Sequence, residues 1–195
     1  MSTHLMIGGA RSGKSRHAME LALASGLQPV YVATSMPYGD DGEFADRVAR
    51  HRGDRGPEWR TVEEPIDLIG VLTQHRAPDT FVVVDCLTLW LTNLLFADDM
   101  AAAVAIDEDP DAVIGVDVKV AVGRVSSATH ALCEAVRLGT GPVAFVSNEV
   151  GQGTVPMHAL TRSFRDQQGW LNQKMAHTVD HVRLLVAGIP LIVKG

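Results

Sequence analysis

The sequence contains only two cysteines, Cys86 and Cys133, among 195 residues. Two thiols allow one disulfide at most, and both have apolar neighbours, so we expect buried, reduced side chains of a cytosolic protein rather than a disulfide-stabilised secreted one. No apolar run approaches the roughly 20 residues that a spanning helix needs, so no membrane span is expected. The amino terminus also lacks the basic start and long apolar run of a signal peptide. These absences predict a cytoplasmic protein.

The sequence also lacks an excess of positive charge. It has 17 Lys and Arg against 23 Asp and Glu, a formal net charge of −6. Such a chain has no general attraction for nucleic acid or an anionic membrane, and we expect neither as a partner. Aromatic residues, 5% of the chain, are too few and scattered to suggest base stacking. A local cationic site for a phosphate ligand is still compatible with this balance.

The hydrophobic content of 46% and the charged content of 21% are those of a globular protein. At this length the chain fits one domain, residues 1–195. Short β-rich runs alternate with helical patterns, which predicts a mostly parallel sheet flanked by helices. The expected strands are His4–Gly8, Pro29–Thr34, Thr80–Asp85, Pro142–Ser147 and Val182–Ala187, and the final "LIVKG" follows Gly188 so closely that it is placed in an antiparallel edge hairpin.

Helices are expected after Gly13 and over Glu43–Arg52, Leu87–Phe96, Val125–Leu138 and Leu160–Asp180. Gly169 lies inside the last of these and weakens the case for an unbroken helix. An acidic, Ala-rich insert near residues 98–118 has Pro110 in its middle and is interpreted as an exposed connection whose role the sequence does not reveal.

One motif carries clear chemistry. "GGARSGKS" matches G-x-x-x-x-G-K-S, follows an apolar strand and precedes a helical pattern, which is the context of a phosphate-binding loop. Backbone N–H groups of such a loop point at phosphate oxygens, and the helix N-terminus adds partial positive charge. Lys14 is expected to reach the β- and γ-phosphates and Ser15 to ligate Mg²⁺. The expected nucleotide contacts here are Gly8, Gly9, Ala10, Arg11, Ser12, Gly13, Lys14 and Ser15. The fold class is therefore α/β and P-loop NTPase-like.

Asp85 ends the third expected strand, "FVVVD", where a carboxylate would complete the Mg²⁺ shell. The alternative is that it only caps the following helix. Molecular switches, motor or transport ATPases and small-molecule kinases all share the loop. GTPase switches carry D-x-x-G and N-K-x-D at strand ends where this chain has "DCLT" and "SNEV". The length of the chain does not suit a motor, so a small-molecule transferase is favoured.

His51 stands among five arginines in "ADRVARHRGDRGPEWRTVEEP". In the expected helix, Phe44, Val48 and His51 share one face, so the imidazole is directed inward. A packed core histidine is one interpretation. The other is chemical, because Arg50 and Arg52 disfavour the imidazolium and leave a neutral nitrogen able to act as base or nucleophile. The residues alone leave both interpretations open.

A resemblance to a known family favours the chemical interpretation of His51. Five segments carry it: "GGARSGKSRHA", "YVATS", "RVARHRGDRGPEWRTVEEP", "LTLWLTNLLF" and "SNEVGQGTVPMHALTRSFRDQQGWLNQKMA". The chain resembles the bifunctional adenosylcobinamide kinase / adenosylcobinamide-phosphate guanylyltransferase family from about residue 4 to its end, apart from the acidic insert. The resemblance implies that His51 becomes covalently guanylylated. It further implies nucleotide contacts at Arg52, Gly53, Asp54 and Arg55, at Glu63 and Asp85, and at Thr34, Ser35 and Met36.

The resemblance implies two reactions. ATP or GTP phosphorylates adenosylcobinamide, and GTP then transfers GMP to the adenosylcobinamide phosphate through the histidine. Mg²⁺ or a similar divalent cation is the expected cofactor, and a homo-oligomer, with a trimer as one form, is the expected assembly. Arg162 and Arg165 are left between a corrinoid or triphosphate site and a solvated helix face, and His17, Asn148 and Glu149 are equally undecided. A plain kinase is the runner-up function, and a regulatory nucleotide-binding module is a third.

Overall fold

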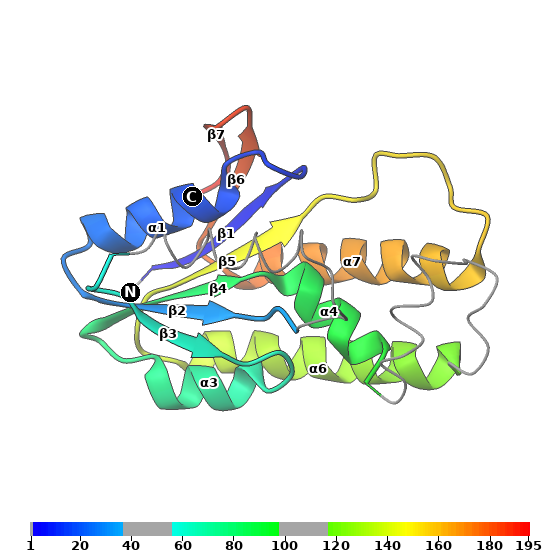
Figure 1. Cartoon of the computed structure of the whole chain (residues 1–195), viewed down its shortest axis with the longest axis horizontal. Helices are drawn as coiled ribbons and strands as arrows, with labels where there is room; N and C mark the ends of the chain where they lie inside the picture. Colours follow the sequence, from blue (N-terminus) through cyan, green and yellow to red (C-terminus); the bar gives the residue numbers. More distant parts are fainter. Residues whose placement is uncertain (1, 37–55, 98–116) are drawn as a thin grey trace.

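The computed structural model describes residues 2–36, 56–97 and 117–195 (Figure 1). Its strands are β1 (Thr3–Gly8), β2 (Gln28–Ala33), β3 (Arg60–Glu63), β4 (Thr80–Asp85), β5 (Val143–Asn148), β6 (His181–Val186) and β7 (Ile189–Lys194). Its helices are α1 (Lys14–Ala24), α3 (Leu68–His75), α4 (Leu87–Leu95), α6 (Val118–Leu138) and α7 (Ala159–Thr178). The strands form one sheet in the order β3-β2-β4-β5-β1-β6-β7. Only the β6–β7 pair is antiparallel, so the expected fold class is confirmed.

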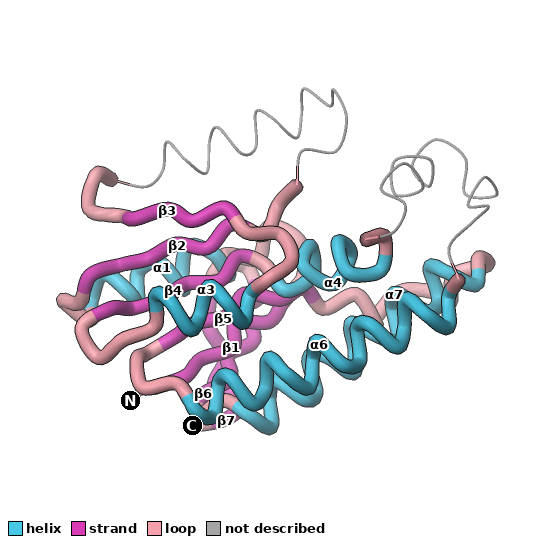
Figure 2. The backbone as a smooth tube through the Cα atoms, turned by 90° about the horizontal axis from the view of Figure 1, so that it is seen from below, coloured by secondary structure: helices cyan, strands magenta, loops and turns pink. Residues whose placement is uncertain are grey.

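The sheet is covered by helices on both faces because its central strands carry buried apolar side chains on both faces. In β4, Val82 and Val84 join the larger core cluster with residues of α3, α4, α6 and α7, whereas Phe81 and Val83 join the smaller cluster with α1. Side chains that alternate between two buried faces require a layer on each side. Figure 2 shows α3 and α6 on the face opposite to α1.

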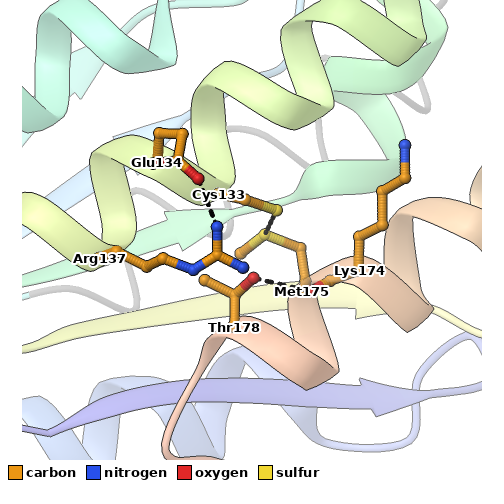
Figure 3. Close-up of polar contacts among 6 residues, drawn as sticks. All are labelled: Cys133, Glu134, Arg137, Lys174, Met175 and Thr178. Atoms are coloured by element: carbon orange, nitrogen blue, oxygen red, sulfur yellow. Dashed lines mark hydrogen bonds and ion pairs between the residues drawn. The ribbon is translucent and has the colours of Figure 1, made fainter.

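Both cysteines are buried and free, as expected. Cys133 on α6 directs its thiol toward the sulfur of Met175 on α7, at 3.9 Å (Figure 3). The nearby polar pairs, Arg137 with Glu134 and the Thr178 hydroxyl with the Lys174 carbonyl, remain within their own helices (Figure 3). The contact between α6 and α7 in this region is therefore apolar.

Three expectations about secondary structure need correction. The edge strand β3 was missed because its four residues are largely exposed and show no apolar pattern. The helix α3 was also missed, although its buried positions Leu68, Val71, Leu72 and His75 follow a helical spacing. Finally, α6 begins at Val118 rather than Val125, since the carboxylate of Asp117 accepts hydrogen bonds from the first-turn amides and caps the helix.

The carboxy-terminal hairpin agrees with expectation, with β7 beginning two residues before "LIVKG". Gly169 does not interrupt α7. The helix ends at Thr178, before the expected Asp180, because the Asp180 carboxylate accepts hydrogen bonds from the amide and hydroxyl of Thr3. None of the described helices is long and apolar enough to cross a membrane. The expected helix Glu43–Arg52 and the core of the acidic insert lie outside the described residues.

Candidate active site at the carboxyl edge of the sheet

The phosphate loop joins β1 to α1, and its backbone is held by close contacts. Gly8 leaves no room for a side chain, because a Cβ there would lie 2.5 Å from the carbonyl oxygen of Leu185 on β6. Gly13 has φ +96°, in the region that favours glycine, and it caps α1. Gly188, in the β6–β7 turn, donates its N–H to the Ser12 carbonyl at 2.9 Å. The loop is thus fixed by its own sequence and by the carboxy-terminal hairpin.

Lys14, the first residue of α1, lies inside this loop with only 6% of its surface exposed. Its ammonium donates to the Gly9 carbonyl at 2.6 Å and to the Ser12 hydroxyl at 3.5 Å. Burial lowers the pKa of this amine, while the nearby Cys86 and Asp85 oppose the shift. A phosphate oxygen offers the ammonium a stronger, charged acceptor than these neutral oxygens. The Lys14 ammonium can therefore give up its hydrogen bonds to the loop and bind the oxygens of a phosphate instead.

Asp85 lies half-buried at the carboxyl end of β4, and Tyr31 on β2 donates its hydroxyl to this carboxylate at 2.7 Å. The helix-cap interpretation is wrong, since the N-cap of α4 is Cys86, whose sulfur accepts from the Leu89 amide. Burial, the largest cause, and the negative charge of Asp85, the second, raise the pKa of the Cys86 thiol to about 12. This cysteine is therefore a poor nucleophile. The Asp85 carboxylate, which accepts from Tyr31 and caps no helix, lies close enough to Lys14 to affect its pKa.

The residue types at this edge suit Mg²⁺. Ser15 is half-buried in the first turn of α1, and Asp85 supplies a carboxylate. Within the described ranges no three His, Cys, Asp or Glu side chains gather into a metal-binding group. Mg²⁺ does not need such a group, because it is usually bound by one or two protein oxygens, substrate phosphates and water. Ser15 and Asp85 therefore fit a nucleotide-borne Mg²⁺ better than a permanent protein-held ion.

Thr34 follows β2 and was expected to contact nucleotide. Its hydroxyl is fully buried, donates to the Cys86 carbonyl at 2.7 Å and accepts from the Cys86 amide at 2.8 Å. The side-chain amide of Asn93 donates to the Thr34 carbonyl at 2.8 Å and to the Pro65 carbonyl at 2.9 Å. The Thr34 side chain thus joins the ends of β2 and β4, leaving the half-buried Ser35 and Met36 for contact with a ligand.

Glu63 is exposed at the end of β3. It is level with Ala33 on β2, which is in turn level with Asp85 on β4, so two carboxylates stand at the same height of the sheet. The remaining expected site residues, His51, Arg52, Gly53, Asp54 and Arg55, lie outside the described residues. The structure therefore brings Lys14 and Asp85 close to each other, with Ser15 next to Lys14 in α1, and puts Glu63 two strands from Asp85 at the same edge.

Three undecided residues now have definite surroundings. Arg162 on α7 donates to the carbonyls of Pro156 and Met157 and holds the loop that precedes its helix. Within the part of the chain that the structure describes, Arg165 forms an ion pair with the neighbouring Asp166, Nε to Oδ1 at 3.8 Å. The Nε2 atom of His17 is buried without a hydrogen-bond partner among the described residues, and burial, with Arg183 next, lowers its pKa. Of the two arginines, Arg162 therefore has a local structural role.

Sequence reasoning missed a buried polar cluster between β5 and α7, formed by Ser147, Gln168 and Asn172. The last two lie in the segment "TRSFRDQQGWLNQ", which the resemblance marked as family-specific. A clue was available, since Gln168 and Asn172 are four residues apart and so share a face of any helix. What that face meets depends on tertiary packing.

The chain is similar to known proteins over nearly its whole length. The family model described as "Cobinamide kinase / cobinamide phosphate guanyltransferase" matches residues 4–193. A bifunctional adenosylcobalamin biosynthesis protein CobP from Pseudomonas aeruginosa is 40% identical over 191 residues, covering 98% of this chain and 96% of that protein. CobU from Salmonella typhimurium is 37% identical over 190 residues, covering 97% of this chain and 98% of that protein.

Among solved structures, the RadB recombinase aligns with a TM-score of 0.46 and 18% identity, covering 94% of this chain and 73% of that one. The family match spans nearly the whole sequence and includes the phosphate loop, the strand that ends in Asp85 and the polar segment of α7. This chain belongs to the cobinamide kinase / cobinamide phosphate guanyltransferase family.

Proposed function

We propose that this chain catalyses two successive reactions on adenosylcobinamide in adenosylcobalamin biosynthesis. A nucleoside triphosphate, ATP or GTP, first phosphorylates the hydroxyl of the aminopropanol arm. GTP then donates GMP to that phosphate and pyrophosphate leaves, giving adenosylcobinamide-GDP. The observation that supports the proposal is the buried Lys14 in a phosphate loop beside Asp85, in a chain of this family.

In the kinase step the chain's contribution is positioning and charge stabilisation, because phosphoryl transfer requires little covalent chemistry from the protein. The loop amides bind the phosphates, and Lys14 leaves the Gly9 carbonyl to neutralise charge on the β- and γ-oxygens. Ser15 and Asp85 would hold Mg²⁺, which when bound screens the phosphate charges. The hydrogen bond from Tyr31 fixes the direction of the Asp85 carboxylate.

In the guanylyl step His51 is the nucleophile. A neutral imidazole nitrogen attacks the α-phosphorus of GTP, the bond to pyrophosphate breaks, and a phosphorus–nitrogen bond forms. A phosphate oxygen of adenosylcobinamide phosphate then attacks the same phosphorus and restores the free imidazole. Arg52 and Arg55 are proposed to stabilise the developing charge, in line with their family positions beside His51.

Nucleotide contacts are proposed to extend beyond the loop along the carboxyl edge, through Ser35, Met36, Glu63 and the run Arg52–Arg55. The support for Ser35 and Met36 is that both are partly accessible at the end of β2. Thr34 is proposed to act by holding the start of this segment in place, since its hydroxyl is bonded to Cys86 and its backbone amide and carbonyl are bonded to Asp85 and Asn93. Crevices at the carboxyl ends of parallel strands are the usual ligand sites of such sheets.

We further propose a cytoplasmic homo-oligomer, with a trimer as the expected form. The support lies in β7, an edge strand exposed at all six positions. It carries four large apolar side chains, Ile189, Leu191, Ile192 and Val193, each more than half exposed. An open, apolar edge strand is an aggregation hazard unless something covers it, and a second copy of the chain is the natural cover.

The decisive experiment supplies purified protein with GTP and Mg²⁺ and measures pyrophosphate release when adenosylcobinamide phosphate is added. The bifunctional enzyme releases pyrophosphate in proportion to the acceptor. A plain kinase phosphorylates adenosylcobinamide but releases no pyrophosphate, and a regulatory module does neither. Either of the last two outcomes would overturn the proposal.

A further inference from the structure

The end of β5 is held by side chains from two different helices. Thr88 on α4 accepts a hydrogen bond from the Asn148 amide at 2.9 Å, and Asn172 on α7 donates to the Asn148 carbonyl at 3.0 Å. The next amide, that of Glu149, donates to the Gly8 carbonyl at 3.0 Å. Both backbone groups of Asn148 are thus bonded to buried side chains, and the strand is joined directly to the start of the phosphate loop.

Asn172 is itself fixed by a buried network. Its side-chain oxygen accepts from the Ser147 hydroxyl at 2.6 Å and from the Gln168 amide at 3.0 Å. Gln168, which is fully buried, also donates to the Ser147 hydroxyl at 2.8 Å, while its own Oε1 has no partner among the described residues. Burying that unpaired acceptor has an energetic cost, which the two hydrogen bonds donated by the Gln168 side chain offset.

The alternation of β5 then determines where the Asn148 side chain lies. Val143 and Phe145 face the larger core, and Ser147 bonds to α7 on that side, whereas Ala144 and Val146 face α1. Asn148 follows on the α1 face, level with Gly8 of the phosphate loop. Val146 is level with Asp85 on β4.

Asn148 therefore stands between the two expected phosphate-site elements, the loop on β1 and Asp85 on β4. Its side chain is half-buried and makes no hydrogen bond to any residue in the described ranges. A side-chain amide at this point, with its backbone fixed on both sides, is a preorganised donor that has no acceptor among the described residues.

We propose that the side-chain amide of Asn148 donates a hydrogen bond to an oxygen of the transferred γ-phosphoryl group in the kinase step. Asn172 is the positioning residue that fixes the location of Asn148. This rests on the proposed donor site at the phosphate loop. Asn148 touches the reacting group, whereas Asn172 acts only through Asn148, with Gln168 and Ser147 fixing its rotamer.

The first test is the steady-state kinase rate of Asn148→Ala with adenosylcobinamide. The expected kcat falls about 10²–10³-fold, as for removal of one donor aimed at developing charge. The KM for the nucleotide changes less than about threefold, because the contact strengthens mainly in the transition state. A wild-type kcat would overturn the proposal. Lys14→Ala is assayed in parallel: if it too is fully active, the donor site itself is wrong, whereas loss in Lys14→Ala alone contradicts only the role of Asn148.

The second test separates positioning from general stability. Asn172→Asp keeps the acceptor for Ser147 and Gln168 but removes the donor to the Asn148 carbonyl. Its kcat is expected to fall about 10–10²-fold, the scale of a misplaced catalytic group. In the Asn148→Ala background the same change should have no further effect on kcat, because the residue through which it acts is gone.

Gln173→Glu is the matched control, since it makes the same amide-to-acid change on the exposed neighbouring position of α7. It is expected to keep the wild-type kcat. Equal losses from Asn172→Asp in both backgrounds, matched by a lower unfolding temperature, would mean that Asn172 only stabilises the fold and would overturn its positioning role.

Discussion

The backbone N–H of Gly188 donates a 2.9 Å hydrogen bond to the Ser12 carbonyl, so the turn between β6 and β7 supports the phosphate loop. Ala187 and Gly188 form a two-residue hairpin loop with φ of +51° and +82°. Positive φ at both central positions is the geometry that matches the right-handed twist of the paired strands. The carboxy-terminal hairpin is thus part of the nucleotide site's support.

Gly188→Ala should lower the free energy of unfolding by about 1 kcal/mol, because a side chain at positive φ is strained. The added Cβ meets only the flexible Arg16 guanidinium, at 3.1 Å, so sterics add little. We expect a severalfold higher KM for the nucleotide. Ala187→Gly is the matched control and should be neutral or stabilising. Unchanged stability and KM in Gly188→Ala would show that the hairpin does not support the phosphate loop.

Lys14→Ala should reduce the kinase kcat by about 10²–10³-fold, since it removes the charge expected at the β- and γ-phosphates. Circular dichroism should show an intact fold, because the ammonium bonds only to atoms of the loop itself. Lys174→Ala, an exposed lysine on α7, serves as control. Wild-type phosphorylation by Lys14→Ala would exclude the loop as the donor site.

His51→Asn should abolish protein labelling by GTP that carries the label in the α-phosphate. Label in the γ-phosphate should not remain on this residue even in the parent protein. The phosphorus–nitrogen adduct is expected to survive alkali and break in acid. Kinase activity should largely persist, because that step needs the loop, the metal and the acceptor hydroxyl. Retained α-label in the variant would return His51 to a packing role.

His4 on β1 gives the fold a defined dependence on pH. Burial first, then His181 and Arg183, lower the pKa of His4 from its ordinary 6.5 to about 4. Between these values the unfolded chain binds a proton that the folded chain does not, so stability rises with pH. The contribution of neutral His4 is complete above pH 6.5 and is lost as the pH falls toward 4.

Urea unfolding of the parent and of His4→Gln at pH 7 and pH 5 measures this effect. The variant should lose less stability on acidification, by about 1 kcal/mol per pH unit at most. His17 and His75, whose pKa values are also lowered, remain in the variant and account for a residual slope. An identical pH slope in both proteins would contradict the inference.

Ile192→Lys tests whether β7 lies between subunits. The side chain is 72% exposed, so a lysine is harmless to the monomer but costly inside an apolar interface. Sedimentation should show a smaller species than the parent. Leu138→Lys, at 79% exposure on the end of α6, is the control and should keep the parent's assembly state. Equal sedimentation of all three proteins would exclude β7 as the interface.

The sequence was sufficient to predict the features whose residues lie next to one another in the chain. Gly13 and Lys14 lie in one contiguous motif with its strand and helix, and β4 is apolar enough to be recognised as a doubly covered strand. It was insufficient where a residue's role depends on a distant partner. Thr34 was expected to contact nucleotide, but its hydroxyl is bonded to Cys86, 52 positions away. Asn172 acquires its role from Asn148, and β3 exists only because β2 offers it an edge.

The strand order also has a consequence for how the protein is made. β1 carries the phosphate loop, yet both of its neighbours, β5 and β6, come from the last third of the chain. Thr3 contacts Asp180 across 177 positions. During synthesis the first strand emerges early but has neither of these neighbours until β5 (Val143–Asn148) has left the ribosome, and such distant pairings form slowly. Nascent chains that stop before β5 should therefore fail to retain nucleotide, however complete the preceding part of the chain is.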